Sequence, residues 1–344
     1  PLVLVIDCTK VTRTVAALVL GCQKMDPNLK IKGVILNQIA GDRHASIIRA
    51  SIEQNCRLPV LGEIPKLEDT PFRERHMGLT PPIEQPGKED SLSFCSEIGQ
   101  KYLDLEGLWK VALNAPPLNP PKCSVEINKK GVDYSVRIGI IKDSAFQFYY
   151  PENLEELERN GGSVVEISAL RDRELPPIDG LYIGGGFPET HMDELVENKS
   201  FRRSLHEAVE NALPVYAECG GAMYLGESVR IQNRIYPMAD IFSVGFILDE
   251  RPWGHGYTIL KSDKANPYFE PGATIRGHEF HYSRVEKWKE DQFCLAFQVK
   301  RGFGFDGRRD GLCYKNVLST YTHIHSLGEK RWAGAFVRRA ELYK

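Results

Sequence analysis

The sequence predicts an α/β protein built on parallel sheets, with a large β-rich insertion in its second half. Short apolar runs alternate with helical spacing over the first 85 residues, and the same alternation restarts after residue 134. From residue 231 onward, short strand-like runs follow one another without helical segments between them. Alternating strand and helix signals are typical of a parallel sheet covered by helices. The later run of short strands indicates an insertion into such a sheet.

Each expected strand of the parallel sheets is a short, continuous apolar run, as in a strand that is buried on both faces. In the first stretch these runs are "LVLVIDC", "IKGVILNQI" and "LPVLGEIP". In the second stretch they are "SVRIGIIKD", "SVVEIS", "DGLYIGGG" and "LPVYAE". The final segment, "EKRWAGAFVRRAELY", has the spacing of an amphipathic helix.

Two proline-rich segments, "PPIEQPGKEDS" and "NAPPLNPPKCS", divide the chain. Such segments are typical of linkers, and helical spacing lies between them over residues 92–113. We therefore expect an α/β domain over residues 1–85, a linker with one helix over residues 86–134, and a second α/β domain over residues 135–344.

The composition excludes several classes of protein. The 344 residues carry a formal net charge of −2, which gives no electrostatic basis for binding nucleic acid or an anionic membrane. No apolar run reaches the roughly 18 residues of a membrane span. The eight cysteines are scattered without a C-x-x-C pair, which argues against a zinc ribbon or a disulfide scaffold and suits a reducing cytoplasm. The chain begins inside an apolar strand without an initiator methionine, so we expect a fragment or a processed product.

Cys219 is the first candidate for chemistry. In "LPVYAECGGAMYL" it follows a strand, and two glycines and a helix follow it. A nucleophile elbow has this order, because glycines let the chain turn sharply and let a substrate approach. The helix start behind the cysteine also favours a thiolate. A buried thiol at a strand end is the other interpretation, and the residues alone leave both open.

Three further segments carry candidate site residues. The glycines of "DGLYIGGGFPET" free backbone N–H groups for an oxyanion hole or an anion site, or else form a tight turn. In "STYTHIHSLG", His323 and His325 alternate at a strand end, so they fit a base and its orienting group, an exposed edge pair or part of a metal site. In "RGHEFHYS", Glu279 and His281 share one strand face, which indicates a site or an interface.

Neither of two common nucleotide-binding patterns applies to this chain. "GFGFDG" matches G-x-G-x-x-G but opens no helix within a βαβ unit, so a glycine-rich hairpin is expected there instead. The phosphate-loop pattern G-x-x-x-x-G-K-[ST] does not occur in the sequence.

The order of several motifs resembles a known family. "GLYIGGGFPE", "YAECGGAMYL", "IRGHEFHYS" and "STYTHIH" closely resemble the glutamine amidotransferase domain of cobyrinic acid a,c-diamide synthases, enzymes of cobalamin biosynthesis. The first segment, with "VILNQIAGDRH" and "VLGEIP", resembles the later part of the same family's ATP-dependent synthetase domain. The resemblance implies part of a phosphate-loop-type synthetase domain, followed by a flavodoxin-like class I glutamine amidotransferase domain.

The resemblance also implies roles for particular residues. Carried over by motif, Cys219 is the nucleophile that forms a thioester with glutamine, and His323 is its base. The backbone amides of Gly185 and Gly220 would form the oxyanion hole. Related amidotransferases have a glutamate two residues after the histidine; His325 stands there in this chain, which leaves its orienting role in doubt.

For the first domain the resemblance implies ATP and Mg²⁺. In related ligases an asparagine at a strand end reads adenine, and Asn37 in "VILNQ" fits that place, although a strand-end cap explains it equally well. Residues around Pro65 in "GEIP" would flank the base. The family's phosphate loop and Mg²⁺ ligands do not precede Pro1, so we expect a competent glutaminase beside an incomplete synthetase.

The implied partners are glutamine, ATP and a tetrapyrrole whose a and c acetates become amides by way of acyl phosphates. The tetrapyrrole is cobyrinic acid or, in the archaeal branch that the ending "YTHIHSLGEKRWAGAFV" resembles, Ni-sirohydrochlorin on the route to coenzyme F430. A cytoplasmic enzyme is expected, and a homodimer is compatible with the sequence. Competing interpretations are cobyric acid synthase, a cysteine protease of the same fold class, and a regulatory protein without catalysis.

Overall fold

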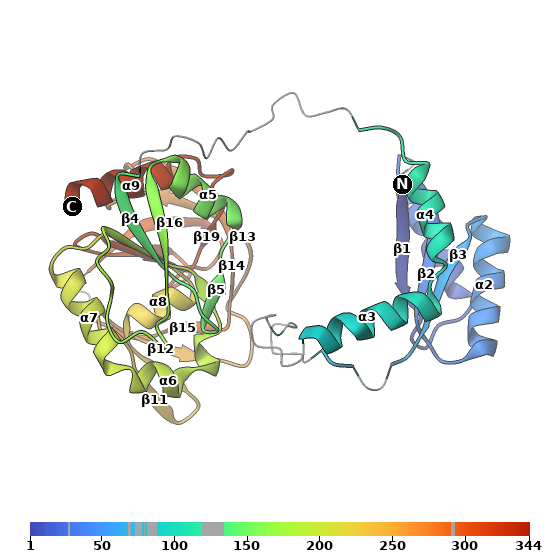
Figure 1. Ribbon diagram of the computed structural model, residues 1–344, viewed down its shortest axis with the longest axis horizontal. Helices are drawn as coiled ribbons and strands as arrows, with labels where there is room; N and C mark the ends of the chain where they lie inside the picture. The colour runs from blue at the N-terminus through green and yellow to red at the C-terminus, as the bar shows by residue number, and fades with distance from the viewer. Residues whose placement is uncertain are drawn as a thin grey trace. The chain divides into compact units, whose positions relative to one another are not determined.

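The computed structural model describes residues 1–26, 28–67, 70–72, 78, 80, 88–118, 134–289 and 293–344. The chain divides into two compact units, unit 1 (Pro1–Ser124) and unit 2 (Val125–Lys344), and each is described by itself (Figure 1). Within the described ranges, none of the helices has both the length and the apolar character needed to cross a membrane. The seven cysteines of these ranges are all free thiols.

Unit 1 is built on a three-stranded parallel sheet in the order β1-β2-β3. Its first five elements are β1 (Leu2–Asp7), α1 (Thr14–Met25), β2 (Ile31–Ile39), α2 (Asp42–Cys56) and β3 (Val60–Pro65). The sheet and the helix pair enclose an aliphatic core that includes Ile6, Val19, Leu36, Ile48 and Ile52. The predicted parallel α/β character of this part is confirmed.

Two helices follow β3 where the sequence predicted one. α3 (Lys88–Tyr102) and α4 (Leu105–Leu113) are separated at Asp104. The side chain of Asp104 accepts a hydrogen bond from the Gly107 N–H at 2.9 Å and so caps α4, while its own N–H bonds to β3. The prediction of one helix over residues 92–113 was therefore wrong at this break, because apolar spacing does not show a cap inside a helical segment.

The large sheet of unit 2 contains five parallel strands that build its central part. They are β4 (Val136–Ile141), β6 (Gly162–Ile167), β7 (Gly180–Ile183), β9 (Val215–Glu218) and β18 (Val317–Thr320). Their order across the sheet is β6-β4-β7-β9-β18. In order of appearance along the chain this is 2-1-3-4-5, the flavodoxin-like arrangement. The predicted flavodoxin-like fold is therefore confirmed.

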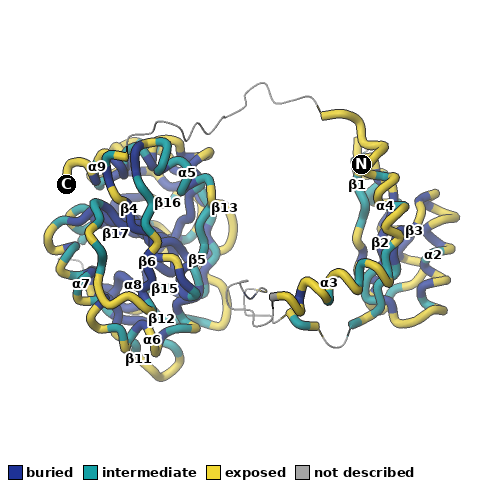
Figure 2. Tube along the Cα trace, viewed as in Figure 1, coloured by how far each residue is buried: buried dark blue, intermediate teal, exposed yellow. Residues whose placement is uncertain are grey.

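Helices cover both faces of these parallel strands. On one face, α5 (Pro151–Arg159) and α9 (Trp332–Tyr343) pack on the sheet through residues such as Leu157 and Trp332. On the other face, α7 (Lys199–Glu210) packs through Phe201, Leu205 and Val209. Figure 2 shows the resulting layering in unit 2, with buried strands inside and exposed helix surfaces outside. Both faces of these strands are covered, and their sequences are therefore continuous apolar runs.

The β-rich insertion lies between β9 and β18, as predicted. Four of its strands form a separate sheet: β10 (Gly226–Ile231), β11 (Arg234–Pro237), β12 (Phe242–Leu248) and β15 (Ser283–Trp288). Four others extend the large sheet: β13 (Gly254–Ser262), β14 (Thr274–His281), β16 (Cys294–Arg301) and β17 (Arg309–Tyr314). β19 (His323–Ile324) then pairs with β14 at the far edge.

The "GFGFDG" segment connects the antiparallel strands β16 and β17. It is therefore the glycine-rich hairpin that the sequence predicted. Gly302, Gly304 and Gly307 have φ angles of 112°, 65° and 82°, which residues with side chains rarely adopt.

Candidate active site

Cys219 occupies a strained turn between β9 and α8 (Gly220–Leu225). Its backbone has φ 49° and ψ −103°, outside the regions that residues with a side chain normally occupy. The Cys219 N–H donates to the carbonyl oxygen of Thr320 on β18 at 2.8 Å, which holds the turn against the neighbouring strand. A strained strand-to-helix turn is the geometry of a nucleophile elbow. A thiol that only fills a core has no need of it.

The two glycines after the cysteine let this turn pack against another backbone segment. A Cβ atom on Gly220 would lie 3.2 Å from the backbone nitrogen of Gly186, and one on Gly221 would lie 2.7 Å from the carbonyl oxygen of Ile183. The second distance is shorter than real Cβ contacts, and the first is tighter than most of them. The glycines therefore allow the N–H groups at the start of α8 to lie beside the segment that follows β7.

That segment contains Gly185, which faces the cysteine and a histidine together. Gly185 and Gly186 form the short strand β8, which pairs with β5 (Phe146–Phe148). A Cβ atom on Gly185 would lie 2.5 Å from Cε1 of His323 and 3.6 Å from Cβ of Cys219. The three residues therefore converge on one small volume, and glycine is the residue that leaves room there.

Tyr149 fixes the glycine segment from the sheet side. Its hydroxyl accepts a hydrogen bond from the Gly184 N–H at 2.8 Å and donates to the carbonyl oxygen of Ile141. Its ring packs edge-on against Tyr182, with 5.0 Å between the ring centroids. Burial raises the pKa of the Tyr149 phenol, so the group stays protonated as a donor.

His323 is buried beside the cysteine at the start of β19, with 8% of its surface exposed. Burial alone would lower the pKa of this imidazole. Its hydrogen bonds and charge interactions with Cys219 and Glu218 outweigh the burial and raise the pKa to about 10. The raised pKa favours the protonated form of His323. A histidine held beside a cysteine is the arrangement that thiol hydrolases use.

Glu218, the residue before the cysteine, contacts the ring nitrogen Nδ1 of His323. Its Oε2 lies 3.3 Å from Nδ1 of His323, and its Oε1 accepts the Ile324 N–H at 3.1 Å. The Tyr182 hydroxyl donates to Oε2 at 3.2 Å. Only 1% of Glu218 is exposed, so these three donors replace the water that the carboxylate loses on burial.

His325 makes a different contact from the one that the sequence suggested. Its Nε2 lies 3.6 Å from the Glu152 carboxylate, and its ring packs on Tyr150 at 4.5 Å between centroids. Glu218, and not His325, lies within hydrogen-bond distance of Nδ1 of His323. The reason is that β19 ends at Ile324, so the alternation of a strand does not carry the side chain of residue 325 to the face of His323.

His278 lies against the ring of His323. It faces His323 across the β14–β19 pair, and the two rings stack with 5.1 Å between centroids and 24° between planes. The Tyr150 hydroxyl lies 3.5 Å from Nδ1 of His278. Burial, and then the neighbouring charge of His323, lower the pKa of His278, so this ring is neutral beside the imidazolium.

Glu279 and His281 share one face of β14, as predicted, but they lie inside unit 2, with 2% and 3% of their surfaces exposed. Glu279 accepts the N–H groups of Phe303 and Gly304 at 2.5 and 3.0 Å, and His281 stacks on Tyr321 at 3.7 Å. Hydrogen bonds from His281 and from these N–H groups overcome the effect of burial and lower the pKa of Glu279. The pair therefore holds the "GFGFDG" hairpin.

Asp310 lies beneath the segment that leads to His323. It is fully buried and accepts hydrogen bonds from the Gly311 N–H at 2.7 Å, the Thr320 hydroxyl at 2.9 Å and the Tyr321 N–H at 3.2 Å. Burial raises the pKa of this carboxyl group to about 6, although the three donors oppose the rise. The Asp310 carboxyl group thus fixes the chain just before the histidine.

We expect Asp310 to make unit 2 less stable as the pH rises from about 4 to about 6. The folded pKa of about 6 exceeds the ordinary value of 3.8, so the folded state binds more protons in this window. The contribution is complete below the lower value and is lost as pH rises through the higher one. A shift of this size corresponds to about 3 kcal/mol. Urea unfolding between pH 4 and pH 7 measures it, and Asp310→Asn, which does not titrate, should lack this component. An identical pH slope in both proteins would contradict the expectation.

In unit 1, Asn37 and Pro65 lie near the carboxyl ends of the neighbouring strands β2 and β3. Asn37 pairs in register with Asp7, and its side-chain oxygen accepts the Gln38 N–H at 3.0 Å. Pro65 pairs in register with Ile39. Both residues are half-buried. Carboxyl ends of parallel strands are where nucleotides bind in open α/β sheets.

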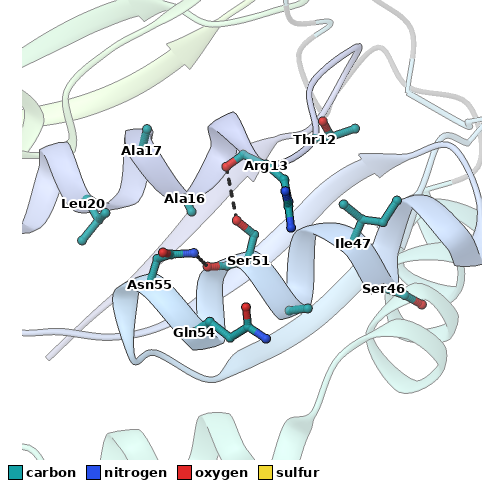
Figure 3. Close-up of a pocket in the computed structure, with 11 residues that line it drawn as sticks. Thr12, Arg13, Ala16, Ala17, Leu20, Ser46, Ile47, Ser51, Gln54 and Asn55 are labelled. Carbon is teal, nitrogen blue, oxygen red and sulfur yellow. Dashed lines mark hydrogen bonds between the residues drawn. The ribbon is translucent and has the colours of Figure 1, made fainter.

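A hollow of unit 1 lies elsewhere. It measures about 1090 Å³ and lies between α1 and α2, where it is lined by residues such as Arg13, Ser46 and Gln54 (Figure 3). The Ser51 hydroxyl donates to the Arg13 carbonyl oxygen at 3.3 Å across it. Neither Asn37 nor Pro65 lines it, so it is separate from the strand ends. The described residues contain no group of three or more His, Cys, Asp or Glu arranged to hold a metal ion.

Two residues of the site were not singled out from the sequence. Glu218 ends the apolar run "VYAE", and a charged residue at the end of an otherwise buried strand is the signal that could have found it. His278 lies next to Glu279, which was singled out, but its neighbour across the sheet is 45 residues away and only the fold shows it.

Comparison with known proteins defines the class of protein. Residues 137–331 match the CobB/CobQ-like glutamine amidotransferase domain, and residues 4–78 match the CobQ/CobB/MinD/ParA nucleotide binding domain. The first match covers the parallel sheet, Cys219 and His323. The chain therefore joins a glutamine amidotransferase domain to a nucleotide-binding domain.

Curated relatives define the family. The chain is 38% identical to the cobyrinate a,c-diamide synthase of Archaeoglobus fulgidus over 99% of its own length and 73% of the relative's. It is 38% identical to that of Magnetococcus marinus over 98% and 73%, and 37% identical to that of Methanosarcina acetivorans over 100% and 73%. The chain belongs to the cobyrinate a,c-diamide synthase family, whose members are glutamine-dependent amidating ligases.

Proposed function

We propose that unit 2 releases ammonia from glutamine through a thioester at Cys219, and that the ammonia amidates the a and c acetate groups of a tetrapyrrole. The observation that carries the first half is the convergence of Cys219, His323 and Gly185 on one volume. The second half rests on family membership, because the relatives that the chain matches are named for this product.

The chemistry of glutamine hydrolysis follows from the geometry. The Cys219 sulfur attacks the side-chain amide carbon, and the C=O electron pair moves to oxygen. In this proposal the backbone N–H groups of Gly185 and Gly220 receive that oxyanion. His323 gives its proton to the leaving nitrogen as the C–N bond breaks, which frees ammonia and leaves the thioester. The neutral imidazole then takes a proton from water, which attacks the thioester and releases glutamate.

Unit 1 would supply the nucleotide end of the reaction. ATP provides the phosphoryl group that turns each acetate into an acyl phosphate, the species that ammonia then attacks. Asn37 fits the adenine end of such a nucleotide, because it lies near the end of a parallel strand with an amide side chain, and Pro65 on the next strand would flank the base. Mg²⁺ accompanies ATP in this proposal. The chain spans 73% of the length of the first of these relatives.

The proposal is tested with the gene product that contains this chain, supplied with ATP, Mg²⁺ and glutamine labelled with ¹⁵N in its amide. Cobyrinic acid and Ni-sirohydrochlorin are offered separately. We expect two ¹⁵N amides in one of them, at the a and c positions, by mass spectrometry and NMR. With ¹⁸O in the acetate carboxylates, one ¹⁸O per amidation should appear in inorganic phosphate. If neither tetrapyrrole is amidated, the proposed substrate is wrong. If the phosphate carries no ¹⁸O, the proposed acyl phosphate intermediate is wrong.

A further inference from the structure

We propose that Glu218 is the orienting carboxylate of His323, so that one strand end supplies both the nucleophile and the group that positions its base. This inference rests on the proposed glutamine hydrolysis. Glu218 is a positioning residue, since it acts through His323 and does not reach the reacting sulfur. Nothing in the family resemblance assigns it this role, and the position two residues after His323 holds a histidine.

The carboxylate is placed to fix His323 in two ways. One oxygen lies 3.3 Å from the ring nitrogen Nδ1, and the other accepts the N–H of the next residue, Ile324, at 3.1 Å. Ring and backbone are therefore held by a single side chain. Because that side chain belongs to the residue before Cys219, the distance between base and nucleophile depends on one strand end.

The contact also determines which ring nitrogen acts. A carboxylate oxygen only accepts hydrogen bonds, so Nδ1 of His323 must carry a proton. In the neutral ring the lone pair is then on Nε2. That is the nitrogen 3.4 Å from the site of a Cβ on Gly185, beside Cys219. The base is thereby directed to the reacting atoms, as the carboxylate of a hydrolase triad directs its histidine.

A further layer holds Glu218 itself. The Tyr182 hydroxyl donates to its Oε2 at 3.2 Å, and the side-chain amide of Asn153 donates to the Tyr182 oxygen at 3.3 Å. The same amide donates to the Ile324 carbonyl oxygen at 3.0 Å. These donors come from α5 and β7, so the carboxylate is anchored by elements other than the strand that carries it.

The titratable groups that face His323 come from three elements. Cys219 and Glu218 come from the end of β9, His278 from β14, and Tyr182 from β7 by way of Glu218. Cys219 and Glu218 favour the imidazolium, and the neutral His278 adds no opposing charge. Removing the charge of Glu218 should therefore lower the pKa of His323, whereas removing a group that only fills space should not.

The test is Glu218→Gln in the full chain, with Glu152→Gln as the matched control. Glu152 also lies beside a histidine, His325, but away from the cysteine. For Glu218→Gln we expect kcat for glutamine hydrolysis to fall about 10²–10⁴-fold with KM within about threefold, because the amide no longer holds the Nδ1 proton. The alkaline limb of the pH profile should move down by about one unit or more. Glu152→Gln should change kcat less than about twofold.

A second measurement does not need turnover. In protein labelled with ¹⁵N-histidine, the Nδ1 proton of His323 should give a slowly exchanging downfield resonance, assigned by its loss in His323→Gln. We expect this resonance in the wild type whether or not the chain hydrolyses glutamine. If the resonance is present but hydrolysis is absent, the proposed function is wrong and the role of Glu218 still stands. A rapidly exchanging Nδ1 proton would overturn the role of Glu218. So would an unchanged pKa of His323 in Glu218→Gln. If that variant does not fold, Tyr182→Phe, which removes one donor to Glu218, should shift the resonance.

Discussion

Replacing Cys219 with alanine is expected to lower glutamine hydrolysis by about 10⁵-fold or more, to the floor of the assay. The reason is that no other thiol of the described chain shares its surroundings. Cys219 alone lies in a strained turn with His323 and Gly185 beside it. The measurement is glutamate release from glutamine, together with mass spectrometry of the protein after treatment with iodoacetamide. Alkylation at residue 219 should disappear in the variant.

The matched control is Cys294→Ala. Cys294 is a demanding control, because a hydrogen bond from Cys313, and then the nearby Lys264 and Arg309, lower its pKa to about 6 against the effect of burial. It lies on β16 in the insertion and has no histidine against it in the described residues. We expect Cys294→Ala to lose one alkylation site and to keep activity within about twofold. Retained activity in Cys219→Ala, or its loss in Cys294→Ala, would move the nucleophile away from residue 219.

Gly185→Ala is the second change with a large expected effect. The added methyl group would lie 2.5 Å from Cε1 of His323, a distance that forces one of the two to move. His323 is held by Glu218 and is buried, so the glycine segment must shift and carry its N–H group away from the oxyanion. Loss of one such donor costs about 10²–10³-fold in kcat, and displacement of the base adds to it. We expect a fall of at least about 10³-fold in kcat/KM.

The control for this change is Gly328→Ala, in the turn after β19. A Cβ there has one neighbour, the His325 carbonyl oxygen at 3.4 Å, which is close to ordinary contact. Its kcat/KM should stay within about twofold of the wild type, and the melting temperatures of all three proteins should be compared. If Gly185→Ala keeps full activity with an unchanged fold, the oxyanion hole does not lie at Gly185.

Much of the fold could be predicted from the sequence because the parallel strands are buried on both faces. Runs such as "VRIGII" and "GLYI" have no polar alternation, and helices separate them, so a doubly covered parallel sheet follows. Two glycines between a strand and a helix pointed to a sharp turn at Cys219, although the residues alone left a buried thiol as the other interpretation. The break at Asp104 was not visible, because a cap depends on one hydrogen bond and not on a pattern.

The arrangement around His323 could be predicted only in part. Alternation placed Glu279 and His281 on one face of β14, and it left His278 on the other face, where it meets His323. Alternation failed for His325, because β19 is two residues long. Glu218 was missed because its partner, His323, is 105 residues away along the chain. Local sequence patterns do not predict contacts between residues so far apart.

That separation has a consequence for a chain that is still being made. At about 5–20 residues per second, a ribosome that has just added Glu218 needs roughly 5–20 s more to reach His323. Until the rest of the chain has been made and β19 pairs with β14, His323 does not lie beside Cys219. Before that point, the Cys219 sulfur of the nascent chain has no histidine beside it to act as a base. Under the proposed mechanism, ammonia release would begin only after this last edge strand is in place, so unfinished chains would not hydrolyse glutamine.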